Sequence, residues 1–245
     1  MSNQIFAYPD TNSSRANIEW LNRKFRGQKI AIIGLGGTGS YILDLVAKTP
    51  VTEIHLYDDD DFLLHNAFRA PGAIDGKLLE DESGLKKVDY YHAVYSHMHT
   101  GVIKHNKRVT PDNIGELAGF GFAFISVDKN KTRAMLTKGL QGLQVPFIDT
   151  GLGVNKLEDT LIGTVRVTAC SPEKSDHLQH RLGEDEFEGN EYATNIQIAD
   201  LNSMNAVLAV IKWKKMVGFY QDLKNENNSL YFINTNKLLN EDPTA

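Results

Sequence analysis

Short apolar runs alternate with amphipathic stretches along most of the chain, and this alternation predicts an α/β fold. Strands are predicted at residues 30–33, 53–57, 102–109, 122–127, 145–149, 160–169 and 230–233. Helical spacing occurs at residues 41–48, 84–98, 129–143 and 200–220. Because strands and helices alternate, we expect a doubly wound, mostly parallel sheet, with antiparallel strands late in the chain.

Glycine, proline and polar clusters set the predicted ends of several elements. Residues 151–153 (Gly-Leu-Gly) are expected to close the strand before them, and Thr110-Pro111 is a favourable helix start. The loop 59–84 is longer than usual, which suggests function or mobility. The polar stretch 171–195 is predicted to be a mobile crossover loop.

The ends of the chain and the long helix complete the predicted organisation. Residues 1–27 are expected to form an N-terminal extension with a short helix from Ser13 through Phe25, and residues 236–245 a frayed tail. In the long helix, Met204, Val207 and Ile211 are predicted to face the core.

Composition narrows the class of protein. The chain has 245 residues, 41% of them hydrophobic and 23% charged, which suits one large domain with a substantial core. A net charge of −5 argues against a broad nucleic-acid-binding surface. No apolar run reaches membrane-spanning length and no signal segment begins the chain, so a cytoplasmic protein without a membrane partner is expected. The single cysteine, Cys170, excludes an intrachain disulfide and a multi-cysteine zinc site.

The most informative stretch is the glycine turn GLGGTGS at residues 34–40, between the first strand and its helix. Glycine permits close approach of a phosphate, and the helix start presents free N–H groups to it. Asp58 ends the second strand, 19 residues past Gly39, where a carboxylate can bind a ribose. This Rossmann-like unit predicts a nucleotide site, although glycine turns also close strand–helix joints without a ligand. A kinase-type phosphate loop is disfavoured because Ser40 stands where lysine is required.

Further charged residues are expected at the same edge of the sheet, where parallel strands end. Asp128 ends a buried strand, and Arg69 and Lys87 lie in the segments after the second strand. A dehydrogenase has no obvious use for these three groups together. A nucleoside triphosphate with Mg²⁺ does, because Asp128 can bind the metal and the two cations can offset phosphate charge.

In this order, the motifs GLGGTGS, LYDDD, HNAFR, GLKK and SVDKNKTR resemble the ThiF/MoeB superfamily of ubiquitin-activating-enzyme-like adenylyltransferases. The resemblance covers roughly residues 15–220. The matching positions are Gly34, Gly36, Gly37, Gly39, Asp58, Asp60, Asn66, Arg69, Lys87, Asp128 and Arg133. The resemblance implies one adenylation domain over residues 1–245.

The activity implied by the resemblance is ATP- and Mg²⁺-dependent adenylation of the C-terminal carboxylate of a small protein, commonly a ubiquitin-like fold ending in glycine. Asp58 would bind ribose and Asp128 would coordinate Mg²⁺. Arg69 and Lys87 would stabilise the reacting phosphorus, and Asn66 would orient the phosphates. The family is dimeric and often lends an arginine across the interface, for which Arg15 is the candidate.

The chain departs from the family pattern at several points. Ala70 stands where glutamine is frequent, Lys129 where asparagine is frequent, and the zinc cysteine pairs of several members are absent. The active lysine could be Lys86 or Lys87. Cys170 ends a strand near the place where some relatives carry a nucleophilic thiol, but a buried structural cysteine is the alternative.

Other functions remain open at this stage. Within the superfamily, the activated carboxylate could belong to a small molecule or a tRNA nucleoside, although the low pI disfavours tRNA. An NAD-dependent oxidoreductase would need a proton-transfer residue that does not stand out. A non-catalytic nucleotide-binding module is the remaining alternative. The histidines at 92, 97 and 99 are expected to be surface or packing residues, because no complementary metal ligand accompanies them.

Overall fold

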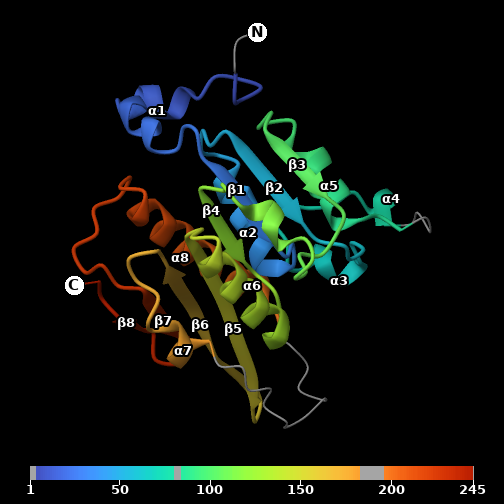
Figure 1. Ribbon diagram of the computed structural model, residues 1–245. Coiled ribbons are helices and arrows are strands. Elements are labelled where there is room, and N and C mark those ends of the chain that lie inside the picture. Colours follow the sequence, from blue (N-terminus) through green and yellow to red (C-terminus); the bar gives the residue numbers. More distant parts are fainter. Residues whose placement is uncertain (1–3, 80–83, 183–195, 245) are drawn as a thin grey trace.

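The computed structural model describes residues 4–79, 84–182 and 196–244, and one sheet runs through this part of the chain. Eight strands follow in the spatial order β3-β2-β1-β4-β5-β6-β7-β8. Their bounds are β1 Lys29–Ile33, β2 Glu53–Tyr57, β3 Val102–His105, β4 Phe122–Ile125, β5 Phe147–Leu157, β6 Thr160–Cys170, β7 Asn228–Phe232 and β8 Lys237–Glu241. Figure 1 shows the strands side by side with helices on both faces.

From β3 to β5 in this order, each strand is parallel to its neighbour. The pairings β5–β6, β6–β7 and β7–β8 are antiparallel, as predicted for strands late in the chain. β1 pairs with β2 on one side and with β4 on the other. The strand order therefore reverses between β1 and β4. In open α/β sheets, ligands bind at the carboxyl end of such a reversal.

The helices divide between the two faces of the sheet. Their bounds are α1 Thr11–Arg15, α2 Gly37–Val46, α3 Leu64–Ala67, α4 Gly76–Leu79, α5 Lys87–Tyr95, α6 Asn130–Gly142, α7 Leu178–Arg181 and α8 Ala199–Met216, with 3-10 helices η1 Glu19–Lys24 and η2 Ile114–Leu117. Side chains of α2, α5 and α8 pack with Ile30, Ile32 and their neighbours in one core cluster. Side chains of α6, α7 and η2 pack with Ala31 and Ile33 on the opposite face. The alternation along β1 thus places successive residues in different cores, as strand geometry requires.

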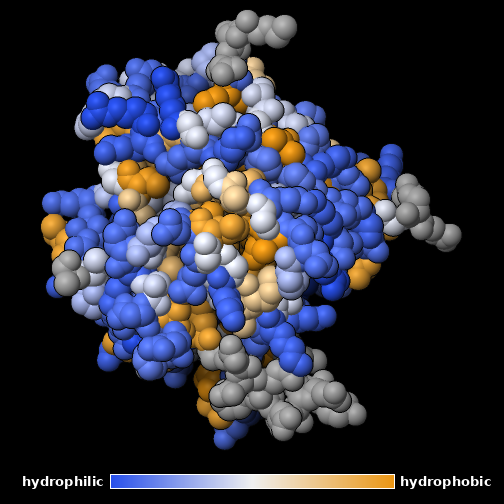
Figure 2. All heavy atoms as spheres, viewed as in Figure 1, coloured by the Kyte–Doolittle hydropathy of each residue, from blue (hydrophilic) through white to orange (hydrophobic). Residues whose placement is uncertain are grey.

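The surface is mostly polar. Figure 2 shows hydrophilic residues over most of one face, with hydrophobic patches gathered along its middle. None of the helices in residues 4–79, 84–182 and 196–244 combines the length and the apolarity needed to cross a bilayer.

Several predictions about element ends are wrong. β5 does not stop at Gly151 but continues to Leu157, because Gly151 leaves space for the Arg166 guanidinium against the strand. The predicted tail from Asn236 contains β8, which pairs with β7. Short-range pattern alone misses this edge strand, since its stability comes from pairing.

The helical predictions also need correction at three places. The helix predicted from Ser13 through Phe25 is interrupted, because Asn17 adopts a left-handed φ of 56° between α1 and η1. Thr110 begins only a turn before η2, and β3 ends at His105 instead of Val109. In the predicted crossover loop, residues 171–182 contain α7, while 183–195 lie outside the described residues.

The apolar stripe of α8 is also different from the prediction. Val207 and Ile211 are exposed, and Met204 is half-buried. The buried face instead carries alanines, Trp213 and the polar residues Asn202 and Asn205. Two buried asparagines on a helix that packs against α2 indicate a functional face.

Candidate nucleotide-binding site

A pocket of about 1050 Å³ opens at the carboxyl end of the parallel strands, where the strand order reverses. The loops after β1, β2 and β4, the middle of β5 and the start of α8 form its walls. Among the predicted site residues, its lining includes Gly34, Gly36, Gly37, Asp58, Asp60, Arg69, Lys87 and Asp128. The fold therefore brings together residues that lie up to 94 positions apart in the sequence.

The glycine turn is packed so closely that side chains are excluded. Gly34 has φ +90°, and a Cβ there would lie 2.5 Å from the Ser126 carbonyl oxygen. Gly39 is the third residue of α2 and does not line the pocket, but a Cβ on it would lie 1.9 Å from the Gly34 carbonyl oxygen. At Gly36, a Cβ would meet nothing within 4 Å. The turn leaves the N-terminus of α2 facing the pocket, which is a favourable position for phosphate.

This difference between the glycines gives a prediction about stability. We expect Gly39→Ala to lower the free energy of unfolding by about 3 kcal/mol, because its Cβ overlaps a backbone atom that cannot move away freely. Gly36→Ala is the matched control and should change it by less than about 1 kcal/mol. Urea denaturation of the two variants measures both values. Equal stability of Gly39→Ala and the parent chain would contradict the packing of the turn.

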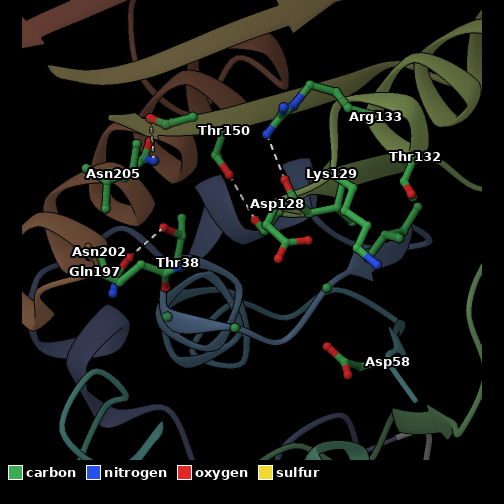
Figure 3. A pocket seen from close by; sticks show the side chains of 18 of the residues that line it. Thr38, Asp58, Asp128, Lys129, Thr132, Arg133, Thr150, Gln197, Asn202 and Asn205 are labelled. Atoms are coloured by element: carbon green, nitrogen blue, oxygen red, sulfur yellow. Dashed lines mark hydrogen bonds between the residues drawn. The ribbon is translucent and has the colours of Figure 1, made fainter. Parts of the chain in front are cut away.

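Asp58 joins the glycine turn to the second strand. Its carboxylate accepts hydrogen bonds from the backbone N–H groups of Leu35 (2.7 Å) and Asp60 (2.9 Å). The residue is buried, and Figure 3 shows its carboxylate at the pocket, on the side away from α8. The sequence pattern suggested ribose binding, but the structure adds a second role: Asp58 fixes the shape of the turn.

The structure separates the two candidate lysines. Lys87 is buried at the start of α5, and its Nζ lies 2.8 Å from an Asp60 carboxylate oxygen and 3.7 Å from Asp58. Lys86 points elsewhere and pairs with Asp61 at 2.7 Å. The Lys87 ammonium holds the pKa of Asp60 below its usual value. Lys87 is therefore the lysine that can reach a ligand in the pocket.

Arg69 is a pocket cation with a buried donor that the described residues leave unused. Its Nε is buried and has no hydrogen-bond partner among the described residues. Burial lowers the pKa of this guanidinium, while the nearby Asp128 carboxylate acts in the opposite direction. A buried guanidinium N–H without a partner is costly, and an anionic ligand would satisfy it.

Asn66 has a local role as well. Its side-chain oxygen accepts the Leu63 backbone N–H at 2.8 Å, at the start of α3. Asn66 lines a smaller hollow that it shares with Arg69 and Lys87, beside the main pocket. Its predicted contact with phosphates stays a prediction, because the amide also serves as a helix cap.

Asp128 lies centrally in the pocket in Figure 3 and is a candidate metal ligand. The loop that carries it is held by Arg133, which donates to the Val127 carbonyl oxygen at 2.7 Å and to the Asp149 carboxylate at 2.9 Å. Asp149 is fully buried and also pairs with Arg166. Carboxylate oxygens suit Mg²⁺, so the donor type at Asp128 fits this metal.

A cluster of three carboxylates also lies at the pocket. In the described part of the chain, one set of three possible metal ligands lies within 4.8 Å of one another, and it comprises Asp58, Asp59 and Asp60. Lys87 and Arg108 neutralise part of this set through ion pairs with Asp60 and Asp59. Asp128 is outside the set and is the carboxylate we retain as the metal candidate.

Other pocket residues were not predicted. Thr38, Thr150, Gln197, Asn202 and Asn205 form the wall opposite Asp58 in Figure 3. The sequence offered one signal for two of them: asparagines three residues apart interrupt the otherwise apolar face of α8. Their convergence with the glycine turn depends on the tertiary packing of α8 against α2.

Arg15 lies outside the pocket within one chain. It is exposed on α1, which precedes β1 and lies near the opposite end of the sheet in Figure 1. A role for Arg15 at the nucleotide would therefore require a second chain.

Cys170 is buried at the end of β6, and burial raises the pKa of its thiol to about 12. At neutral pH the group is a thiol and not a thiolate, so this environment disfavours the nucleophilic role considered from the sequence.

This environment predicts slow thiol chemistry. We expect Cys170 in the folded protein at pH 7.5 to react with an aromatic disulfide reagent at least about 100-fold more slowly than in urea-unfolded protein. Because the folded pKa is raised, the rate should increase with pH towards 12 as long as the fold persists. Absorbance of the released thiolate measures the rate. Equal rates in the two states would contradict the buried assignment.

Comparison with known proteins identifies the family of the chain. The sequence profile described as ThiF family matches residues 13–242, almost the whole chain. The chain belongs to the ThiF family. The family assignment confirms the resemblance inferred from the ordered motifs and extends it towards the C-terminus.

One curated relative of this ThiF-family chain is the tRNA threonylcarbamoyladenosine dehydratase of Escherichia coli (strain K12). The two are 26% identical over 166 residues, which is 65% of this chain and 58% of the relative. The chain therefore spans less than two thirds of that relative's length.

Solved structures share the fold. E. coli MccB with ATP superposes with a TM-score of 0.75 at 16% identity, over 97% of this chain and 73% of MccB. PaaA gives 0.70 at 17% identity, over 96% of this chain and 84% of PaaA. TcdA (CsdL) gives a TM-score of 0.62 at 20% identity, over 84% of this chain and 92% of TcdA. The α/β fold with late antiparallel strands is thereby confirmed.

Proposed function

We propose that the chain is an ATP- and Mg²⁺-dependent adenylyltransferase that activates the C-terminal carboxylate of a small protein or peptide. The observation that carries the proposal is the Arg69 guanidinium nitrogen, which has no partner among the described residues and lies in one pocket with Lys87, Asp128 and the N-terminus of α2. Membership of the ThiF family supports adenylyl-transfer chemistry. Related MccB has been solved with ATP, which supports ATP as the nucleotide.

In the proposed reaction, a carboxylate oxygen of the substrate attacks the α-phosphorus of ATP. A new oxygen–phosphorus bond forms as the bond to the leaving pyrophosphate breaks, giving an acyl-adenylate. Because both reactants are anions, positioning and charge stabilisation supply most of the catalysis. The protein's part is therefore to bring the two anions together and to balance their charge.

Most of the predicted site residues have a place in this scheme. Arg69 and Lys87 stabilise the charge that develops on the phosphoryl oxygens, and the free N–H groups at Gly36 and Gly37 cradle phosphate. Asp58 binds the ribose while it holds the turn, and Asn66 orients the phosphates. Mg²⁺ held by Asp128 would neutralise phosphate charge.

The partner belongs to the same proposal. MccB has also been solved with MccA, which supports a polypeptide substrate for this chain. We propose a ubiquitin-like or other small protein ending in glycine, activated by a homodimer in which Arg15 of one chain reaches the nucleotide of the other. Size-exclusion chromatography with light scattering tests the homodimer.

A second candidate function is suggested by the curated relative. Its name refers to threonylcarbamoyladenosine in tRNA, and the family resemblance left open activation of a carboxylate on a tRNA nucleoside. The net charge of −5 counts against it, because tRNA binding depends on basic surface that neutralises phosphates.

Thermal stability with different nucleotides tests the proposal. ATP with Mg²⁺, at about 100 times its dissociation constant, should stabilise the fold by roughly 2.7 kcal/mol and raise the melting temperature clearly. ATP with a chelator should give a smaller shift, and NAD none. A shift with NAD alone would overturn the proposal in favour of an oxidoreductase, and no shift with any nucleotide would overturn it outright.

A further inference from the structure

Two asparagine side chains on α8 are buried at the pocket with part of their hydrogen-bonding capacity unused. Asn202 and Asn205 are each 1% exposed and both line the pocket. Among the described residues, the Asn202 Nδ2 donor and the Asn205 Oδ1 acceptor have no partner. Native proteins rarely leave buried amide groups unpaired, because each such group costs about 1–3 kcal/mol.

The neighbours of these amides define which atom stays free. Asn205 Nδ2 donates to the Gly151 carbonyl oxygen at 3.0 Å. Because a carbonyl oxygen can only accept, the amide nitrogen must face it, and Oδ1 is the atom without a partner among the described residues. Asn202 Oδ1 accepts the Thr38 hydroxyl at 3.2 Å, and this contact leaves Nδ2. Asn202 Nδ2 also lies over the start of α2, where a Cβ on Gly37 would approach it to 2.0 Å. The unused donor and acceptor are therefore one helical turn apart on the same wall.

This wall lies across the pocket from Asp58 and borders the start of α2, where Asn202 packs against Gly37. In Figure 3, Asn202, Asn205 and Thr38 lie on one side of Asp128, while Asp58 lies on the other. A nucleotide whose ribose lies at Asp58 and whose phosphates reach the glycine turn would thus have the α8 wall beyond its phosphates, which leaves that wall for the second reactant.

One edge of the second half of β5 has no partner among the described strands, and this edge leads away from the same wall. β4 pairs with β5 only as far as Asp149, because β4 ends at Ile125. β5 itself continues to Leu157. Beyond Asp149, the described strands pair with β5 only through β6. The opposite edge of Thr150–Leu157 can accept an extended segment, since an unpaired edge is a template for an added strand.

We propose that Asn202 and Asn205 recognise the backbone of an extended peptide substrate at the residue next to its C-terminus. In an extended chain, the N–H and C=O of one residue point to the same side. Asn205 Oδ1 accepts that N–H, and Asn202 Nδ2 donates to that C=O. The terminal carboxylate, one residue further on, then reaches the α-phosphorus near Asp128. This inference rests on the proposed function and adds how its substrate is recognised.

The chemistry of the pair favours a peptide over other reactants. A carboxylate or phosphate offers acceptors alone and would leave Asn205 Oδ1 unpaired, whereas a peptide residue satisfies both amides. A nucleoside carrying a ureido group also offers a donor and an acceptor. The bare edge of β5 and the net negative charge of the chain favour the extended peptide over RNA.

A pair of ligands that differ in one group tests the proposal. The probes are N-acetylglycylglycine and acetoxyacetyl-glycine, in which an ester oxygen replaces the N–H of the penultimate residue. Calorimetric titration of the full chain is done with and without a non-hydrolysable ATP analogue and Mg²⁺. We expect the parent chain to bind the amide saturably and about tenfold more tightly than the ester, because the ester leaves a buried acceptor unpaired.

Two variants test whether Asn205 causes the preference for the amide over the ester. Asn205→Leu should bind both ligands with equal affinity, whereas Asn240→Leu, a surface control on β8, should keep the tenfold preference. Equal binding of the two ligands by the parent chain overturns the proposal, and this comparison needs no variant. A preference that persists in Asn205→Leu, or no saturable binding of the amide, also overturns it.

Two further measurements distinguish peptide recognition from nucleoside recognition and from the proposed adenylation. Binding of N6-threonylcarbamoyladenosine, but not of the dipeptide, with loss in Asn205→Leu, would assign the pair to a nucleoside and overturn the peptide. The nucleotide-dependent melting shift is measured on the same samples. Its absence, with the amide preference intact, would overturn adenylation while leaving peptide recognition standing.

Discussion

Asp128→Asn is expected to remove the Mg²⁺ dependence of ATP binding. Asparagine keeps the volume of the side chain but loses the charge that makes Asp128 a strong ligand for a hard cation. The affinity for ATP with Mg²⁺ should fall about 100-fold, to the value that the parent chain shows with a chelator. The stabilisation of roughly 2.7 kcal/mol by ATP with Mg²⁺ should then shrink to less than about 1 kcal/mol. Calorimetric titration and melting curves measure the two effects.

A surface aspartate provides the control for this change. Asp89 is on α5 and pairs with Lys104 away from the pocket, so Asp89→Asn should keep the metal dependence. The melting temperature of Asp128→Asn without nucleotide should stay close to that of the parent chain, since no hydrogen bond from the described residues depends on its carboxylate. Parent-like ATP affinity that still responds to a chelator would rule out Asp128 as the metal ligand.

Arg69→Met is expected to lower the rate of pyrophosphate release from ATP by about 100- to 1000-fold, which is the usual effect of losing one donor to the developing charge. Methionine fills similar space without the guanidinium. The loss should appear mainly in kcat if Arg69 acts on the transition state, and mainly in KM if it only binds ATP. The rate is measured with a saturating carboxyl-terminated peptide by a coupled pyrophosphate assay.

Arg181→Met is a suitable comparison for this experiment. Arg181 pairs with Glu241 and Asp242 near the C-terminus of the described chain and does not line the pocket. Its loss should leave pyrophosphate release within about twofold. Arg69→Met should also be at least as stable as the parent chain, because it removes a buried donor that has no partner among residues 4–79, 84–182 and 196–244. An unchanged rate in Arg69→Met would remove this residue from the proposed mechanism.

The positions that could be predicted from sequence are those where local chemistry leaves little choice. The glycine turn between an apolar run and a helix, followed by Asp58 at the end of the next strand, required a strand–turn–helix–strand unit. Gly34 and Gly39 prove to be sites where any Cβ would collide with backbone. Asp128 could be placed at the same edge because parallel strands end there together.

The failures have a common physical reason, because each concerns a contact between distant segments. β8 forms because β7 offers it a partner, and β5 passes Gly151 because Arg166 of β6 covers that glycine. Val207 and Ile211 lie on the exposed face of α8, and a helical repeat alone cannot say which stripe meets the sheet.

The sequence by itself determined the order of β1 to β7 and of α2, α5, α6 and α8, the glycine turn and the family, because ordered motifs with fixed spacing carry that information. Only the tertiary structure decided that Lys87 faces the pocket while Lys86 pairs with Asp61, and that Cys170 is buried beyond easy ionisation. It also decided that the polar face of α8 completes the pocket. Hydrogen-bond satisfaction and burial depend on which segments meet in space, and spacing along one chain does not fix those meetings.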